Sequence, residues 1–474
     1  MGSFATECIE RNDQPILVVG LGRSGIAASR LLLSKGKDVI AIDTRSNESL
    51  ERTRRELEQA GTRVFLSCET IPQEQFACAV ISPGVSVQSD AVQGLNRLGV
   101  RLLPEFELGW SQMNIPTVAV TGSNGKSTAV KWIAESMAAA GLSATIGGNY
   151  GTPLSEIALS SPKLDWLVVE LSSFQLETHV DFRADIAVLL NLNPNHLDRH
   201  GDMREYERIK MRIYENAGRD DFCILPLDMM DSEFLPARPA RWSTFGRDAK
   251  AQWRFRDGAV RWAPDRDKVW RPQPEASTAC GVGDESCADI SGTYFGNGVM
   301  GITAAAVFAV CHAARVGVKY ALGAAIAFKG LPHRMEVLDV DSDLKFINDS
   351  KATNISAMKA ALEMTDGTIR LIAGGRAKES SFAAASGILR DKVAKVYLIG
   401  ESSRAMLEQW GAFVECLDCG DLLQAVKKAV REASAGDTII LSPGCASFDQ
   451  FHSFEERGCF FIKCVKDLEA GSII

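Results

Sequence analysis

Short apolar runs recur along the chain, and each is followed by a polar or glycine-containing turn and then by an amphipathic stretch. The clearest runs lie at residues 16–19, 39–42, 79–81, 117–120, 166–169, 186–190, 344–347, 371–373, 396–399 and 438–441. This alternation is typical of buried strands joined by helices in parallel sheets. We therefore expect an α/β fold.

The expected elements separate into three segments, at residues 1–104, 105–330 and 331–474. The length of 474 residues agrees with this division, because a domain holds about 150 residues on average. We therefore expect three domains with these boundaries.

The helical pattern lapses between residues 223 and 289. Tryptophans flank Asp257-Gly258 in this part of the chain, and such a pair is typical of the turn of a β-hairpin. We expect a small β-rich excursion here, with a proline- and glycine-containing surface loop at residues 267–288.

Composition and charge exclude several classes of protein. Apolar residues make up 46%, charged residues 24%, and the net charge is −8, which argues against disorder and against a basic surface for nucleic acid. The first 15 residues lack the apolar core of a secretory signal. No apolar run approaches the ~18 residues of a membrane span. We expect a cytoplasmic protein without membrane insertion.

The first glycine-rich loop, residues 20–25, follows a strand and opens a helix. Its missing Cβ atoms allow a diphosphate to approach the positive end of that helix. Asp43 ends the next strand, 18 residues after Gly25, where an acid can bind ribose hydroxyls. NAD fits this pattern, but any nucleoside diphosphate can use the same geometry, and a tight turn without a ligand is the structural alternative.

The second glycine-rich loop, residues 121–128, also lies between a strand and a helix. Gly125, Lys126 and Ser127 supply backbone amides for phosphates, an ammonium group for the β and γ oxygens, and a hydroxyl for Mg²⁺. The spacing departs from the usual P-loop, since Val120 occupies its first glycine position. We still expect a nucleoside triphosphate site.

Further candidate groups follow other predicted strands. Glu170 ends a buried strand, where it can hold Mg²⁺ or act only as an acid beside a helix N-terminus. His196 follows the next strand, whereas Lys210 is a surface lysine as far as its sequence context indicates. Asp349 and Lys351 lie in a turn before a helix, where phosphate binding and helix capping both explain them. Because these groups follow strands, we expect all three segments to face one cleft.

These motifs together resemble the Mur ligase family, and most closely its members that add D-glutamate to UDP-N-acetylmuramoyl-L-alanine. The resemblance covers nearly the whole chain. It rests on the order of residues 20–25 with 43–45, 82–84, 121–128, 147–149, 170–177, 196–199, 330–334, 348–354 and 441–454.

The resemblance implies a Rossmann-like N-terminal domain, a P-loop ATPase-like central domain with a mixed sheet, and a Rossmann-like C-terminal domain. The first glycine loop then binds the UDP part of the substrate rather than NAD. The implied UDP-substrate residues are Gly22, Arg23, Ser24, Asp43, Thr44, Arg45, Ser82, Gly84, Asn149 and His196.

The resemblance also assigns residues to ATP and to two Mg²⁺ sites. The implied ATP residues are Gly122, Asn124, Gly125, Lys126, Ser127, Thr128, Arg334, Asp349 and Lys351. Ser127 and Glu170 match one metal site, and His196 with Lys210 matches the second, where the family's lysine is carbamylated. Lys126, Glu170, His196 and Lys210 are the expected catalytic residues.

D-glutamate is the implied third substrate. The matching residues are Thr353, Lys378, Ser447, Phe448 and Phe454. The implied activity is amide formation through an acyl phosphate, in the synthesis of peptidoglycan precursors for the cell wall, and hence in cell shape and division. We expect a monomer.

Three departures from the family pattern leave rivals open. Asn195 stands where an acid usually precedes the histidine, Asn297 lies in an altered adenine motif, and Lys378 lacks the glycine that usually follows it. The rivals are a Mur ligase for another amino acid, an NAD(P)-linked oxidoreductase, and a nucleotide-binding protein without catalysis.

Overall fold

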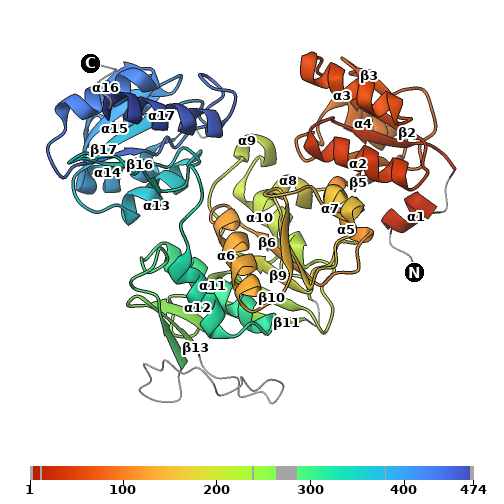
Figure 1. Cartoon of the computed structure of the whole chain (residues 1–474), viewed down its shortest axis with the longest axis horizontal. Coiled ribbons are helices and arrows are strands. Elements are labelled where there is room, and N and C mark those ends of the chain that lie inside the picture. The colour runs from red at the N-terminus through yellow and green to blue at the C-terminus, as the bar shows by residue number, and fades with distance from the viewer. Residues whose placement is uncertain (1–3, 11–12, 238–239, 263–285, 379–380, 470–474) are drawn as a thin grey trace.

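The computed structural model describes residues 4–10, 13–237, 240–262, 286–378 and 381–469. Three sheets form three lobes, one within each predicted segment (Figure 1). The N-terminal lobe, drawn in red and orange, and the C-terminal lobe, drawn in blue, lie on the same side of the central lobe. The three-domain α/β expectation is confirmed, while the boundaries at residues 104 and 330 stay predictions.

The N-terminal sheet has five parallel strands in the order β3-β2-β1-β4-β5. Its strands are β1 (Ile16–Val19), β2 (Val39–Asp43), β3 (Arg63–Leu66), β4 (Ala79–Ile81) and β5 (Leu102–Pro104). Its helices are α1 (Phe4–Glu10), α2 (Arg23–Ser34), α3 (Glu48–Gln59), α4 (Asp90–Arg97) and α5 (Glu105–Ser111), which leads into the central lobe. This is the Rossmann-like arrangement that was expected.

The central sheet has nine strands in the order β14-β13-β12-β11-β10-β9-β6-β8-β7, and it is mixed because β12, β13 and β14 pair antiparallel. Its strands are β6 (Thr117–Thr121), β7 (Ala144–Gly148), β8 (Trp166–Glu170), β9 (Ile186–Leu189), β10 (Phe222–Pro226), β11 (Arg241–Gly246), β12 (Trp253–Arg256), β13 (Ala259–Trp262) and β14 (Ser286–Asp289). Its helices are α6 (Lys126–Ala139), α7 (Leu154–Ser160), α8 (Ser173–Leu176), α9 (Leu197–His200), α10 (Met203–Met211), α11 (Met300–Ala313) and α12 (Val318–Ala327).

The β-rich excursion is the outer part of this sheet. β12 and β13 pair as a hairpin about Asp257-Gly258, as predicted, and Asp257 has a left-handed φ of 51°. The prediction of a loop reaching residue 288 was wrong at its end, because β14 pairs with β13 from Ser286 onward. The rest of that loop, residues 267–285, lies outside the described residues.

The C-terminal sheet has six strands in the order β15-β16-β20-β17-β18-β19, and only β15 runs antiparallel to its neighbour. Its strands are β15 (Glu336–Val337), β16 (Lys345–Asn348), β17 (Ile369–Gly374), β18 (Val393–Ile399), β19 (Glu415–Gly420) and β20 (Thr438–Leu441). Its helices are α13 (Ile355–Met364), α14 (Ser386–Lys392), α15 (Ser403–Trp410), α16 (Leu422–Glu432) and α17 (Phe454–Glu469).

The central strands of all three sheets are apolar at consecutive positions because helices cover both faces of each sheet. All residues of β1, β6 and β20 are buried. Within the described ranges, no helix is long and apolar enough to cross a membrane. The polar residues that follow these strands therefore lie at defined sheet edges, where they form the candidate site.

Candidate active site

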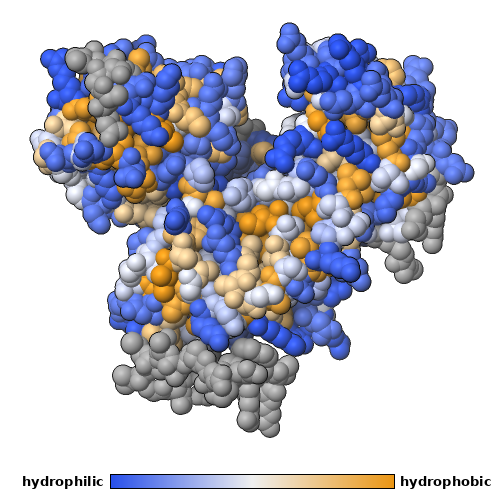
Figure 2. All heavy atoms as spheres, in the orientation of Figure 1, coloured by the Kyte–Doolittle hydropathy of each residue, from blue (hydrophilic) through white to orange (hydrophobic). Residues whose placement is uncertain are grey.

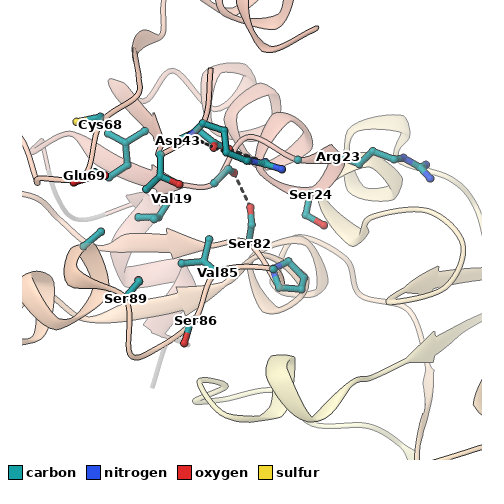
Figure 3. A pocket seen from close by; sticks show the side chains of 18 of the residues that line it. Val19, Arg23, Ser24, Asp43, Cys68, Glu69, Ser82, Val85, Ser86 and Ser89 are labelled. Carbon is teal, nitrogen blue, oxygen red and sulfur yellow. Dashed lines mark hydrogen bonds and ion pairs between the residues drawn. The ribbon is translucent and has the colours of Figure 1, made fainter. Parts of the chain in front are cut away.

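A cavity of about 860 Å³ lies over the carboxyl ends of the N-terminal strands (Figure 3). Nine of the ten predicted UDP-substrate residues line it: Gly22, Arg23, Ser24, Asp43, Thr44, Arg45, Ser82, Gly84 and Asn149. Asn149 comes from the central lobe, so the cavity joins two lobes. His196, the tenth predicted residue, is not among the residues that line it.

The glycines of the first loop have different roles. A Cβ atom on Gly25 would lie 1.8 Å from the Gly20 carbonyl oxygen, so Gly25 allows α2 to pack against the turn. A Cβ atom on Gly22 would meet no atom within 4 Å, and Gly22 lines the cavity. Gly25 therefore serves the fold, whereas Gly22 leaves space where a ligand can approach the backbone.

Asp43 lines the cavity and holds neighbouring groups of its wall in place. Its carboxylate accepts hydrogen bonds from the backbone N–H groups of Leu21 and Arg45, at 2.8 and 2.9 Å, and from the Arg45 guanidinium. Burial raises the pKa of Asp43, but these hydrogen bonds outweigh burial and lower the pKa below its usual value. Asp43 is therefore an ionised acceptor that holds the loop of Leu21 and the side chain of Arg45 in place.

The cavity also contains residues that the sequence analysis missed. They are Cys68, Glu69, Ser86, Ser89 and Asp90, together with apolar neighbours. Cys68 and Glu69 follow β3, whose alternating burial gives no continuous apolar run. Their position directly after a strand could have indicated these two residues, but only if β3 itself had been predicted.

The second glycine loop leads into α6, which begins at Lys126. Gly125 has a φ of 82°, a left-handed conformation that glycine adopts at no steric cost. The Lys126 Nζ atom donates to the carbonyl oxygens of Gly122 and Ser123, at 2.8 and 3.0 Å. Asn191, which follows β9, exchanges two hydrogen bonds with the Asn124 backbone. Asn191 thus braces the loop.

Glu170 connects the second glycine loop to the first cavity. It is 2% exposed, and its carboxylate accepts hydrogen bonds from Ser127 Oγ at 2.5 Å and from Asn149 Nδ2 at 2.6 Å. Ser127 is the second residue of α6, while Asn149 lines the cavity at the N-terminal lobe. One buried acid therefore lies between the two predicted nucleotide sites.

Lys210 is not a surface lysine, so the expectation from its sequence context was wrong. The side chain is 1% exposed, and its Nζ atom donates to Thr121 Oγ1 at 2.8 Å and to the Gly122 carbonyl at 3.1 Å. Burial, followed by the charge of Lys126, holds the pKa of Lys210 well below its ordinary value. Helix α10 thus directs an amine of lowered pKa toward the second glycine loop.

His196 caps α9 in a left-handed conformation, with a φ of 56°. Burial and then the charges of Lys378 and Lys126 lower the pKa of His196 to about 3. The imidazole is therefore neutral near pH 7, and its lone pair is available for a metal.

His200, a buried histidine that the sequence analysis missed, supports this region. His200 lies 2.9 Å from Ser173 Oγ through Nε2 and 3.2 Å from Glu177 Oε1 through Nδ1. Its ring also packs against Tyr206, whose hydroxyl reaches Ser123 Oγ at 3.2 Å. These contacts connect α8, α9 and α10 to the second glycine loop.

The C-terminal lobe contributes the predicted cations. Arg334 Nη2 donates to Ser127 Oγ at 2.8 Å, which joins this lobe to the start of α6. Asp349 accepts a 2.7 Å hydrogen bond from Ser442, and burial raises its pKa to about 7. Lys351 lies 3.5 Å from the centre of the Phe454 ring, and burial, then Arg334, lowers its pKa to about 8.

The predicted D-glutamate residues are only partly brought together. Lys378 Nζ donates to Thr353 Oγ1 at 3.3 Å, and Lys378 lies close enough to Lys126 and His196 to lower the pKa of both. Ser447 is buried, but Phe448 is 63% exposed. The expectation of one cleft between lobes agrees with these contacts, and Figure 2 shows the surface hollowed between the three lobes.

The side chains at this site suit an Mg²⁺ ion that is bound partly by nucleotide phosphates, rather than one enclosed by protein groups alone. Among the residues that the structure describes, no group of three or more His, Cys, Asp or Glu could hold a metal. Mg²⁺ is commonly bound by one or two protein groups and by substrate phosphates. Ser127 with Glu170 satisfies that requirement at the start of α6, whereas His196 would need an anionic partner.

The structure places two of the residues that depart from the expected motifs. Asn297 accepts hydrogen bonds from the N–H groups of Val299 and Met300, and so supports the start of α11. Asn195 is buried at 7% exposure, directly before the strained His196.

Three family models match consecutive parts of the chain. They are described as Mur ligase MurD-like, N-terminal domain, at residues 14–103; Mur ligase middle domain, at 120–275; and Mur ligase, glutamate ligase domain, at 333–445.

Curated relatives match over nearly the whole length. UDP-N-acetylmuramoylalanine--D-glutamate ligase from Desulfatibacillum aliphaticivorans is 34% identical over 96% of this chain and 98% of that protein. The protein of the same name from Pelotomaculum thermopropionicum is 35% identical, with the same coverage of both chains.

Solved structures show the same fold at low identity. MurF from Acinetobacter baumannii has a TM-score of 0.60 at 15% identity, covering 97% of this chain and 98% of that chain. UDP-N-acetylmuramate-alanine ligase MurC from Thermotoga maritima has a TM-score of 0.57 at 15% identity, with 96% and 100% covered. The chain belongs to the Mur ligase family.

Proposed function

We propose that the chain catalyses the ATP-dependent addition of D-glutamate to UDP-N-acetylmuramoyl-L-alanine, a step of peptidoglycan precursor synthesis. The proposal rests on the contacts between the C-terminal lobe and the second glycine loop. Arg334 donates a hydrogen bond to Ser127, and Lys378 lies near Lys126. A ligase needs three ligands in one place, and the relatives' printed name supplies the identity of the acceptor and of the amino acid. Monomeric state and cytoplasmic location stay predictions.

The reaction consists of two transfers. The substrate carboxylate attacks the γ-phosphorus of ATP, which releases ADP and forms an acyl phosphate. The amine of D-glutamate then attacks the acyl carbon; phosphate leaves, an amide bond forms, and the amine loses a proton. Positioning is the main contribution of the protein to both steps.

The cations of the cleft have defined places in this scheme. Lys126 and Arg334 offset charge on the transferring phosphoryl group, and Lys378 with Thr353 receives a carboxylate of D-glutamate. Asp349 and Lys351 face ATP. When bound, Mg²⁺ supplies further charge neutralisation at the phosphate oxygens, held by Ser127 and Glu170 at one site and by His196 and Lys210 at a second.

We also propose that Lys210 is carbamylated. Only a neutral amine attacks CO₂, and burial lowers the pKa of Lys210. Attack of the neutral amine on CO₂ forms a C–N bond and releases one proton, and the carbamate that remains carries one negative charge. Carbamylation would thus turn the Lys210 amine into an anionic oxygen ligand and supply the anionic partner that His196 would need.

The test is incubation of the chain with UDP-N-acetylmuramoyl-L-alanine, ATP, Mg²⁺ and D-glutamate, followed by mass measurement of the nucleotide product. We expect a mass increase of one glutamate residue and one phosphate released per product. A panel of other amino acids serves as the control. Equal turnover with another amino acid would contradict the specific proposal, and ATP binding without any product would contradict catalysis.

A further inference from the structure

A buried arginine of α17 touches three loops of the C-terminal lobe, which is drawn in blue in Figure 1. Arg457 is 1% exposed, although arginine is rarely buried completely unless it is paired. Its Nε atom donates to Ser350 Oγ at 3.0 Å, and its Nη2 atom donates to the carbonyl oxygens of Ser350 and Cys445, at 2.8 and 3.0 Å. One guanidinium group therefore joins the turn after β16 to the loop after β20.

The third loop, which follows β17, lies directly against the same guanidinium group. A Cβ atom on Gly375 would lie 3.2 Å from Arg457 Nη1 and 2.3 Å from the Ala446 carbonyl oxygen, so only glycine leaves room here. Arg376 and Ala446 exchange two backbone hydrogen bonds of 2.9 Å, which pair this loop with the loop after β20. Arg457 therefore lies at the junction of all three loops.

These three loops carry four of the residues that are expected to bind D-glutamate. Thr353 lies in the turn between β16 and α13, and Lys378 lies in the loop after β17. Ser447 and Phe448 lie in the loop after β20. A displacement of Arg457 would therefore move several parts of the predicted amino-acid site at once.

We propose that Arg457 is a positioning residue for D-glutamate, which holds the three loops together and attracts the side-chain carboxylate of this substrate through its buried charge. The proposal rests on the proposed function for the identity of the amino acid. It adds a residue to which the sequence analysis assigned no role.

The charge of Arg457 is not balanced by an adjacent carboxylate. Among the residues that the structure describes, no Asp or Glu forms an ion pair with Arg457, and its Nη1 atom has no hydrogen-bond partner. Burial lowers the pKa of Arg457 to about 10, against the attraction of Cys445, Asp449 and Asp349, so the group is a cation near pH 7. An unpaired buried charge is costly, and an anion bound in the adjoining loops offsets part of that cost.

The place of the reacting amine decides which carboxylate Arg457 attracts. Lys378 lies close enough to Lys126 to lower its pKa, so a carboxylate received by Lys378 lies beside the second glycine loop. The amine and the α-carboxylate of an amino acid share one carbon atom, and in the proposed reaction the amine must reach the acyl carbon at that loop. The α-carboxylate then pairs with Lys378, and the side-chain carboxylate extends toward the loops that Arg457 joins.

Arg370 offers a matched control in the same lobe. Its side chain is 13% exposed, pairs with Asp437 at 2.7 Å and donates to the Tyr397 hydroxyl at 3.1 Å. It is the second residue of β17, whereas the three loops follow the ends of strands. Arg370→Met therefore removes a largely buried arginine from this lobe without loss of a contact to the loops.

The test is steady-state kinetics of the full chain, with D-glutamate varied at saturating UDP-N-acetylmuramoyl-L-alanine and ATP. Arg457→Met should raise the KM for D-glutamate about 10-fold or more and leave the KM for the UDP substrate within about threefold. Arg457→Lys keeps the charge but not the planar fork, so its KM for D-glutamate should return to within about threefold of the unaltered chain. Arg370→Met should leave the KM for D-glutamate unchanged.

D-glutamine separates the charge of Arg457 from its effect on the shape of the loops. Its side chain is neutral, so loss of the guanidinium charge weakens D-glutamate selectively. The ratio of kcat/KM for D-glutamate to that for D-glutamine should therefore fall about 10-fold or more in Arg457→Met. A change of loop shape alone would lower both values of kcat/KM equally.

Thermal unfolding of each variant shows whether it is folded. Arg457→Gln, which keeps amide donors for the Ser350 and Cys445 carbonyls but has no charge, replaces Arg457→Met if the latter does not fold. We expect the same rise in the KM for D-glutamate in Arg457→Gln, because the charge is lost in both variants.

The outcomes separate this inference from the proposed function. An unchanged KM for D-glutamate in the folded, uncharged variant, or an equal rise in Arg370→Met, would overturn the role of Arg457 alone. An unchanged preference for D-glutamate over D-glutamine would overturn the role of its charge. Absence of ligation by the unaltered chain would overturn the proposed function and this inference together.

Discussion

Lys126 illustrates how a single side chain is placed by its loop. Its ammonium group donates to the Gly122 and Ser123 carbonyls. Glu170 attracts this group, while Arg334 and Lys378 repel it. An anion that enters the loop adds a further attraction and offsets the repulsion among the cations. The ammonium group is therefore prepared for a phosphoryl group rather than for a structural ion pair.

Replacement of Lys126 by Ala should lower kcat by about 10²–10³-fold, because the charge that stabilises the transferring phosphoryl group is lost. Binding of UDP-N-acetylmuramoyl-L-alanine should be unchanged, since Lys126 does not line that cavity. Phosphate release and calorimetry measure the two effects. The control is Lys163→Met, at an exposed position; retained turnover in Lys126→Ala would refute the role.

Lys351 should make the use of ATP sensitive to alkaline pH. Its pKa is lowered to about 8, so the cation is present below pH 8 and is lost above it. We expect kcat/KM for ATP, at saturating UDP substrate, to fall above about pH 8, because this ratio reports ionisations of the enzyme before ATP binds. Lys351→Arg should move the fall to higher pH, and an unchanged profile would assign it to another group.

Residue roles divide into those that a sequence can predict and those that it cannot. Glu170 and Lys126 were predicted because Glu170 ends a buried strand and Lys126 lies in a glycine loop before a helix. Lys210 was read as a surface residue because it lies within a polar helix, α10, whose buried face is set by packing against Thr121 and Gly122. Burial against a distant segment leaves no local sequence signal.

At the scale of elements, the strands that were predicted are those buried on both faces. β1, β4 and β20 have the predicted bounds, since their apolar runs are continuous. β3 and β19 lie at sheet edges and carry exposed polar residues, so their sequence resembles a loop. The missed edge strand β3 explains why Cys68 and Glu69 were missed in the cavity.

The turn between β1 and α2 should separate stability from binding. Gly25→Ala places a Cβ atom 1.8 Å from the Gly20 carbonyl, and we expect a loss of about 1–3 kcal/mol or more in the free energy of unfolding. Gly22→Ala meets no protein atom, so stability should be kept while the KM for the UDP substrate rises. Thermal unfolding measures the stability of both variants, and steady-state kinetics measures their KM for the UDP substrate. Equal destabilisation by both substitutions would contradict the assignment of Gly25 to the fold and Gly22 to binding.

In the proposed function, each lobe binds one ligand and the chemistry takes place in the cleft between the lobes. The sequence predicted three lobes, but the contacts that orient them, such as Arg334 to Ser127, are 207 residues apart in the chain. No local sequence pattern can predict a contact between residues so far apart in the chain. The net charge of −8 gives no guide either, because all three proposed ligands are anionic and are received by a few converging cations.

This division predicts that substitutions in different lobes change different kinetic constants. Arg45→Ala removes a wall of the first cavity, so the KM for UDP-N-acetylmuramoyl-L-alanine should rise about 10-fold or more, as expected for loss of a charge-assisted hydrogen bond. Arg334→Ala should raise the KM for ATP and lower kcat, because the contact with Ser127 is lost. Lys378→Ala should raise the KM for D-glutamate.

The kinetic effects of substitutions in different lobes are not fully independent, and this can itself be tested. Lys378 lowers the pKa of Lys126 and of His196, so Lys378→Ala should raise both pKa values and shift the pH profile of kcat. Arg45→Ala should leave both that profile and kcat at saturation within about threefold of the unaltered chain, because Arg45 pairs with Asp43 at the first cavity. Full kinetics with each ligand varied in turn measure all three constants for each variant. A rise in the KM for D-glutamate in Arg45→Ala, equal to that in Lys378→Ala, would show that the lobes do not act as separate binding units.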